Sequence, residues 1–327
     1  MSRRAARPAA ALAAAAVSAA LLALALATVA ASAETPLPAG PVAGAALPPY
    51  AGAAPFRWEY PDTIAAVMTD LIGQAETIAA PIYAELGLTM VRGVVVRVAR
   101  DHADFLKLAP PGDAFPEWSQ GITIPPRGEI YLTVFDARGA ATDLGRTFAH
   151  EVSHVAVHVA SGGKPVPRWF VEGYAILQSG EFSMDQVETM AQLVARGGVS
   201  LRRMDRAFHD HAPSASAAYG AAADFVRFYR DACGRPALAR VVAAVRDGAD
   251  FYEAMGRLCH AGAAAGAPVP GESFDALEAR WAAGLRERYP WWMVFRDDGL
   301  LFAAGGVLVV LAFLAVRRRR RVSLAAM

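Results

Sequence analysis

The feature that most constrains the fold is a pair of predicted helices at the centre of the chain, joined by a short glycine turn. Residues 142–160 have apolar side chains at helical spacing, and Gly162-Gly163 ends that pattern. Pro167 opens a second helix, which ends at Gly180. Because the turn is short, we expect the second helix to fold back against the first.

The rest of the folded region predicts an α+β domain, because strands come early and helices come late. We expect strands at residues 90–99 and 128–135. We expect helices at residues 61–86, 236–248 and 274–288. Residues 105–126 contain Pro-Pro-Gly and Pro-Pro breaks and are expected to form a loop. The expected domain, within residues 56–290, is a small mixed or antiparallel sheet followed by a mostly helical core.

Both ends of the chain carry long uncharged segments bordered by arginines. Residues 1–33 predict a secretory signal peptide with Ala31-Ser32-Ala33 as its cleavage signal, and an uncleaved anchor is the alternative. Residues 34–55 are rich in proline and glycine and predict a linker. Residues 299–316 predict a transmembrane helix, and the arginine-rich residues 317–327 predict a cytoplasmic tail.

These ends predict a single-pass protein of the bacterial cytoplasmic membrane, with its folded domain on the extracytoplasmic side. Arginine outnumbers lysine thirty to two, which is typical of a GC-rich bacterial coding sequence. Eight of the 32 basic residues lie at the two ends, whereas all 31 acidic residues lie between residues 34 and 298. The folded region is therefore net acidic, which argues against nucleic acid as a partner.

The first of the two central helices contains the sequence His150-Glu151-Val152-Ser153-His154. Histidines four residues apart lie on one face of a helix, so both imidazoles can reach one zinc ion. The intervening Glu151 projects beside that position, where it can act as a general base. Two histidines on a solvated helix face are the alternative. The pattern favours a site for one Zn²⁺ per chain.

A catalytic zinc has three protein ligands and one open position, so a third ligand is needed. Glu172 in the second helix is the expected third ligand, because the glycine turn lets that helix fold back toward the histidines. His158 lies one further turn along the first helix, but its spacing is too close to complete the site comfortably. The alternative for Glu172 is an exposed acid favoured by the helix dipole.

These residues resemble the gluzincin metallopeptidases, in particular the bacterial peptidase MA-like family, and are distantly similar to the zinc core of alanyl aminopeptidases and leukotriene hydrolase. The resemblance covers roughly residues 60–285 and implies a thermolysin-like helical zinc core. Besides the histidine motif, the segments that carry it are Trp118–Gly121, Gly128–Leu132, Trp169–Ala175, Tyr219–Val226 and Phe274–Trp281.

The resemblance implies a membrane-anchored, extracytoplasmic zinc metallopeptidase that acts on peptides or proteins. His150, His154 and Glu172 would hold the zinc, and Glu151 would take a proton from the attacking water. Two other functions stay open. The domain can be a catalytically inactive zinc-binding or interaction domain, or a zinc amidase that acts on cell-wall peptides.

Tyr219 corresponds in the resembled family to a tyrosine that donates to the oxyanion, and His209 and His211 are rival donors. The chain also departs from the thermolysin pattern. The residue four positions after Glu172 is Ile176 rather than an acid. The sequence therefore leaves open which residue orients His150.

The strand at Gly128–Leu132 matches the strand in which aminopeptidases of the resembled group carry an acid for the substrate's free amine. Its one acid, Glu129, lacks the surrounding pattern of that group and can simply face solvent. We therefore expect this strand to pair with an extended substrate backbone, which predicts an endopeptidase.

The chain has two cysteines, Cys233 and Cys259. In an exported domain they can form one disulfide, and two buried thiols are the alternative.

Overall fold

The computed structural model describes residues 54–181, 190–192, 194, 200–204, 213–259, 272–289, 305–311 and 313. The predicted signal peptide, nearly all of the predicted linker, the basic tail, and His209 and His211 lie outside the described residues. The described part is an α+β fold in which a small mixed sheet is followed by most of the helices.

The sheet has four strands in the order β1-β2-β4-β3. Their bounds are Phe56–Glu59 for β1, Val94–Ala99 for β2, Gly121–Ile124 for β3 and Glu129–Thr133 for β4. Strands β1, β2 and β4 are parallel, and Val96 lies opposite both Trp58 and Ile130. Strand β3 is antiparallel to β4, with Thr123 opposite Ile130. In the described sheet, β4 is therefore an interior strand and β3 is an edge strand.

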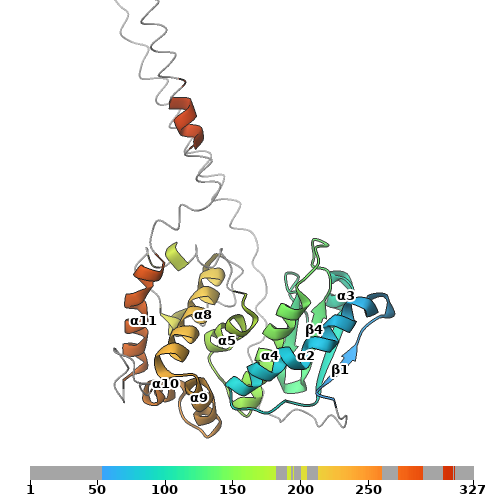
Figure 1. Cartoon of the computed structure of the whole chain (residues 1–327), viewed down its shortest axis with the longest axis horizontal. Helices are drawn as coiled ribbons and strands as arrows, with labels where there is room; N and C mark the ends of the chain where they lie inside the picture. Colours follow the sequence, from blue (N-terminus) through green and yellow to red (C-terminus); the bar gives the residue numbers. More distant parts are fainter. Residues whose placement is uncertain are drawn as a thin grey trace, which may run out of the picture. The chain divides into compact units, whose positions relative to one another are not determined.

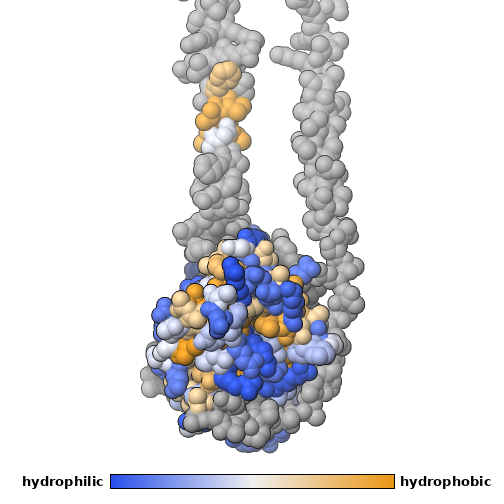
Figure 2. Space-filling model, turned by 90° about the vertical axis from the view of Figure 1, so that its right-hand side faces the viewer, coloured by the Kyte–Doolittle hydropathy of each residue, from blue (hydrophilic) through white to orange (hydrophobic). Residues whose placement is uncertain are grey.

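The two faces of the sheet differ because successive side chains of a strand point to opposite sides. Val96 and Ile130 are fully buried in the main apolar core. On the other face, Arg97 pairs with Glu59 at 2.8 Å and with Glu129 at 2.9 Å. Figure 2 looks at the side of the molecule on which Figure 1 labels β1 and α3, and hydrophilic residues cover much of it.

Nine helices have described bounds: α2 (Ala65–Glu85), α3 (His102–Lys107), α4 (Leu144–Ala160), α5 (Arg168–Ser179), α7 (Leu201–Met204), α8 (Pro213–Cys233), α9 (Pro236–Arg246), α10 (Phe251–Leu258) and α11 (Phe274–Arg288). Helix α4 contacts β3 and β4, and it also contacts α2 and α5. Helix α5 in turn packs against α8. Figure 1 shows this succession, with α4 between the strands and the group that contains α5 and α8.

The predicted central pair of helices is present as α4 and α5. Asp143 caps α4 by accepting a hydrogen bond from the backbone N–H of Arg146 at 3.1 Å. Pro167 precedes the first turn of α5, and Gly180 ends the helix with a φ of 70°, which a side chain disfavours. Both helices bury a broad apolar face, so packing against neighbours stabilises them.

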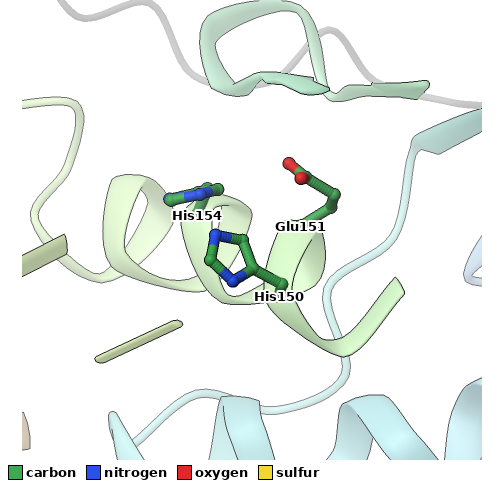
Figure 3. Close-up of side chains that lie close together, drawn as sticks. All are labelled: His150, Glu151 and His154. Atoms are coloured by element: carbon green, nitrogen blue, oxygen red, sulfur yellow. The ribbon is translucent and has the colours of Figure 1, made fainter. Parts of the chain in front are cut away.

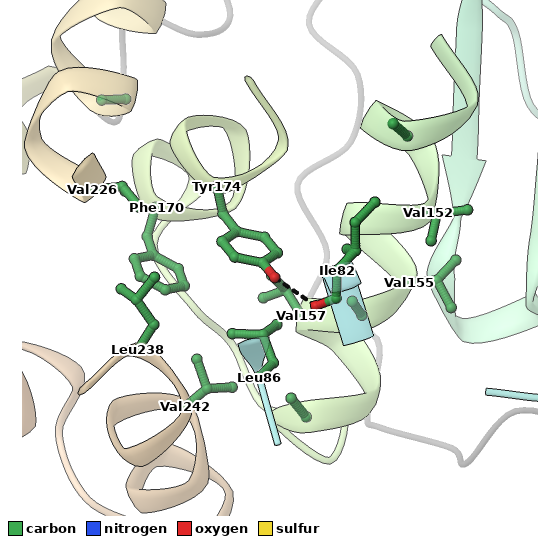
Figure 4. Packing of buried hydrophobic residues seen from close by; sticks show 14 of the residues in the cluster. Ile82, Leu86, Val152, Val155, Val157, Phe170, Tyr174, Val226, Leu238 and Val242 are labelled. Carbon is green, nitrogen blue, oxygen red and sulfur yellow. Dashed lines mark hydrogen bonds between the residues drawn. The ribbon is translucent and has the colours of Figure 1, made fainter. Parts of the chain in front are cut away.

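One buried hydrogen bond joins α5 to α2 across this core. The hydroxyl of Tyr174 donates to the backbone carbonyl oxygen of Ile82 at 2.6 Å (Figure 4). Phe170, Val157 and Leu86 pack around the pair, and all are at most 4% exposed. A polar group buried in this way needs a partner, and Tyr174 thereby fixes α5 beside the helix pair α2 and α4.

The sequence-based secondary structure is right for α2, α4, α5, α9 and α11 and wrong in the segment 105–126. That segment contains the end of α3 and all of β3 instead of being a loop throughout. The strand β3 has only four residues and is followed at once by Pro125 and Pro126, so its sequence is typical of a loop. It becomes a strand because β4 offers it a hydrogen-bonding partner.

The transmembrane helix expected at 299–316 is a wrong prediction. In that stretch the structure describes helix at residues 305–311 and 313. No helix among the described residues is long and apolar enough to cross a bilayer. This finding contradicts the predicted fold class in its membrane helix, and it contradicts the predicted localisation as a single-pass protein of the bacterial cytoplasmic membrane.

Cys233 and Cys259 form a disulfide, with Cα atoms 4.6 Å apart. It joins the last residue of α8 to the residue that follows α10. Of the two alternatives for these cysteines, the structure therefore has the bonded one.

Candidate metal centre

Helix α4 brings together three side chains of types that can bind a metal ion. His150, Glu151 and His154 each place one ligand atom within 4.8 Å of the others, and this group could hold a metal ion. The two imidazole rings lie 5.0 Å apart, because residues four apart are neighbours on one helical face. Figure 3 shows both rings side by side and the carboxylate of Glu151 pointing toward the strands that lie over the helix.

Helix α5 brings Glu172 to the same place. Oε2 of Glu172 lies 3.7 Å from Nε2 of His150, and the residue is 9% exposed. Two ligand atoms that each lie about 2.1 Å from a tetrahedral zinc are about 3.4 Å apart, so this separation fits a shared ion. Glu172 is not within the tight group formed by His150, Glu151 and His154. It nevertheless faces the first histidine, as the folding back of the second helix predicts.

The charges at the site suit these roles. Burial lowers the pKa of His154 to about 4, so its imidazole is neutral at pH 7 and its lone pair can bind a metal. Burial acts to raise the pKa of Glu172, but the neighbouring His150 and the charge of Arg168 lower it to about 2. Glu172 is therefore an ionised carboxylate with an orienting cation, and Nε of Arg168 lies 3.4 Å from its Oε1.

Glu181 supplies the partner of His150 that the sequence left open. Its Oε2 lies 2.8 Å from Nδ1 of His150. A carboxylate accepts, so Nδ1 donates its hydrogen to Glu181, and this contact leaves Nε2 on the side of Glu172 as the nitrogen that would bind a metal once it has lost its proton. Burial acts to lower the pKa of His150, but the carboxylates of Glu172 and Glu181 outweigh burial and hold that pKa well above its usual value. The sequence signal for Glu181 is weak, because it is one acid directly after the glycine that ends α5.

The edge strand β3 holds the carboxylate of Glu151. The hydroxyl of Thr123 donates to Oε2 of Glu151 at 2.7 Å. Burial raises the pKa of Glu151 to about 7, although His150 and the Thr123 hydrogen bond act in the opposite direction. A carboxyl group with a pKa near neutrality can both accept and release a proton, which is what a general base that later acts as an acid requires.

Helix α8 carries Tyr219 toward the same site. Gly173 of α5 lies so close to α8 that a Cβ atom on it would be 2.6 Å from backbone atoms of Ala222. Tyr219 lies one turn before Ala222, so this close approach sets it beside Glu172, and Arg168 is its hydrogen-bond partner. Burial raises the pKa of Tyr219 to about 12, so its hydroxyl keeps its hydrogen at neutral pH.

Two other sequence-based candidates lie apart from this arrangement. His158 is on α4 but does not belong to the metal-binding group found among the described residues. Glu129 is on the other face of the sheet, where Arg97 and the hydroxyl of Tyr131 contact its carboxylate at 2.9 and 2.8 Å. The carboxylate of Glu129 is therefore paired with these two side chains, and it points away from the face of the sheet that packs on α4.

The strand that was expected to pair with a substrate is not at an edge of the described sheet. That expectation concerned Gly128–Leu132, but β4 already pairs with β2 on one side and with β3 on the other. Its main-chain groups are used inside the sheet. In the described sheet, the edge next to Glu151 is β3, which sequence reasoning interpreted as part of a loop.

Comparison with known proteins adds no relative from which a function could be transferred. No protein-family model matches the chain, and no curated protein matches it. A functional assignment therefore depends on the chemistry of the site itself.

Proposed function

We propose that the protein is a zinc-dependent metallopeptidase that cleaves internal peptide bonds. The observation that carries this proposal is the approach of Oε2 of Glu172 to within 3.7 Å of Nε2 of His150. His150 in turn has its ligand atom within 4.8 Å of those of Glu151 and His154. Two imidazoles and one carboxylate, with a second carboxylate alongside, are the donor set of a catalytic zinc site of the His-Glu-x-x-His type. Glu181 supports it by orienting the first histidine.

In the proposed reaction, His150, His154 and Glu172 would hold the zinc. When bound, zinc supplies a Lewis acid that polarises the scissile carbonyl and makes a water more acidic. Glu151 takes a proton from the attacking water and delivers it to the amine nitrogen as the peptide bond breaks. Tyr219 donates its hydroxyl hydrogen to the carbonyl oxygen as negative charge develops there.

The outer edge of β3 is the proposed binding strand for the substrate. A substrate in extended conformation adds main-chain hydrogen bonds to such an edge, and this mode does not require a free terminus. Glu129, the acid considered as an amine anchor, is engaged by Arg97 on the opposite face of the sheet. These two features favour cleavage of internal bonds over removal of the first amino acid.

The function is tested with the purified full chain and unstructured peptides blocked at the N-terminus by acetylation. We expect about one zinc per chain and hydrolysis of these peptides. His154→Ala should lose the zinc, whereas Glu151→Gln should keep it and lose at least about a hundredfold in kcat. Glu76→Gln, which changes an exposed acid of α2, is the matched control.

Three results would contradict the proposal. Zinc content that is unchanged in His154→Ala would remove the ligand assignment. Near-normal turnover by Glu151→Gln would remove the general base. Cleavage of aminoacyl reporter substrates without cleavage of acetylated peptides would indicate an aminopeptidase.

A further inference from the structure

The hydroxyl of Thr123 has two acceptors, and both belong to Glu151. It lies 2.7 Å from the side-chain atom Oε2 and 3.0 Å from the backbone carbonyl oxygen of the same residue. A threonine hydroxyl has one hydrogen to donate. Both acceptors belong to Glu151, so the hydroxyl hydrogen of Thr123 is donated to Glu151 in either orientation.

The neighbouring position on β3 also bears on Glu151. A Cβ atom on Gly121 would lie 2.7 Å from Oε1 and 3.0 Å from Cγ of Glu151. Thr123 and Gly121 are two residues apart and therefore point to the same face of the strand. Thr123 donates to Oε2 of Glu151, whereas Gly121 has no side chain and so lets Oε1 lie close to the strand without a clash.

We propose that Thr123 is a positioning residue for the general base, and that it fixes Oε1 as the carboxylate oxygen that receives the proton from water. The inference rests on the proposed function, because it assigns a proton-transfer role to Glu151. During the transfer, a water O–H bond breaks and an Oε1–H bond forms. Oε2 accepts the Thr123 hydrogen bond throughout. The same proton then leaves Oε1 for the nitrogen of the departing amine, which restores the carboxylate.

The position of Thr123 in the sheet gives this contact a further consequence. Thr123 pairs through β3 with Ile130 of β4, and β3 is the edge to which we propose that the substrate adds. The strand that would bind the substrate is therefore the strand that holds the base. Binding that orders β3 also orders Glu151, so loss of the Thr123 hydroxyl should reduce kcat more than it changes KM.

The test compares Thr123→Val with Thr123→Ser in the zinc-loaded full chain. Valine has the shape and strand preference of threonine but no donor, whereas serine keeps the hydroxyl. We expect Thr123→Val to keep its zinc, to lose on the order of tenfold in kcat, and to change KM by less than about twofold. Thr123→Ser should recover most of the lost turnover. A normal kcat in Thr123→Val, or an equal loss in both variants, overturns the inference.

A second measurement does not depend on activity. Crystal structures of the two variants should show the carboxylate of Glu151 displaced in Thr123→Val and unmoved in Thr123→Ser. An unmoved Glu151 in Thr123→Val overturns the positioning role. If the wild-type protein hydrolyses no peptide, the proposed function fails, but these structures still decide whether Thr123 positions Glu151.

Discussion

Nδ1 of His150 lies 2.8 Å from Oε2 of Glu181, although 31 positions separate the two residues in the chain. The contact joins α4 to the residue that follows the glycine cap of α5. It gives the imidazole a fixed orientation and directs Nε2 toward Glu172, 3.7 Å away. Histidines that bind a metal through one ring nitrogen commonly donate the other ring N–H to a carboxylate, which fixes the orientation of the ring.

Removal of Glu181 should weaken metal binding without removing a ligand. We expect Glu181→Ala to raise the dissociation constant for zinc by about 10- to 100-fold, because His150 loses the acceptor that orients it. Competition with a chromogenic chelator measures this constant. Glu76→Ala, which removes an exposed carboxylate from α2, should leave it unchanged. Equal zinc affinity in Glu181→Ala and the wild type would contradict the assigned role.

Loss of the Tyr219 hydroxyl should impair turnover but not metal content. Tyr219→Phe removes one hydrogen-bond donor to the developing oxyanion, and such a loss reduces kcat by about 100- to 1,000-fold. Zinc analysis and steady-state kinetics on the same acetylated peptides check both parts. Unchanged turnover would assign the donor role to another residue, and His209 and His211 would be tested next.

The close approach of α5 and α8 should make Gly173 intolerant of a side chain. In Gly173→Ala, the new Cβ atom would lie 2.6 Å from backbone atoms of Ala222, so the helices must separate. We expect a loss of about 1–3 kcal/mol in the free energy of unfolding. Turnover should also fall, because α8 carries Tyr219.

Gly73 offers a matched control for this substitution. It lies inside α2, and a Cβ atom there would meet nothing within 4 Å. Gly73→Ala should therefore stabilise the protein by about 0.5–1 kcal/mol, since alanine favours helix more than glycine does. Urea unfolding of both variants compares them, and equal effects of the two substitutions would rule out the steric explanation.

The buried carboxylate of Asp224 should make stability fall in acid. It accepts hydrogen bonds from the indole of Trp281 at 2.8 Å and from Arg288 at 2.9 Å, and so joins α8 to α11. Burial acts to raise the pKa of Asp224, but the hydrogen bonds from Trp281 and Arg227 outweigh burial and hold that pKa below its ordinary value of 3.8. The stabilisation is fully present above the unfolded-state pKa and is lost as the pH falls through the lower folded-state pKa.

Urea unfolding between pH 6 and pH 2 tests this behaviour. Asp224→Asn should cost about 1–3 kcal/mol at pH 6, because it removes the charged acceptor of Trp281 and of two half-exposed arginines, and it should flatten the acid limb of the stability curve. Asp247→Asn, at an exposed acid after α9, should leave the curve close to that of the wild type. An acid limb of unchanged slope in Asp224→Asn would show that other carboxylates cause it.

Local sequence patterns determined the helices of the site. The apolar spacing of 142–160, the glycine turn and Pro167 predict α4 and α5, and the four-residue interval between His150 and His154 places both on one face. These features depend on contacts within one or two helical turns. A short hinge between two amphipathic helices also leaves few ways to pack them, so the approach of Glu172 follows from the same segment.

Tertiary structure decided the partners of these residues. Thr123 reaches Glu151 only because a four-residue strand pairs with β4, and Glu181 reaches His150 only because α5 ends where it does. Neither residue has a neighbour in sequence that marks it. The transmembrane helix was predicted from a long uncharged segment followed by arginines, and no helix among the described residues is long and apolar enough to cross a bilayer. Apolar spacing determines helices through contacts between residues that are near in sequence. The pairing of β3 with β4 and the contact of Glu181 with His150 depend instead on segments that only folding brings together.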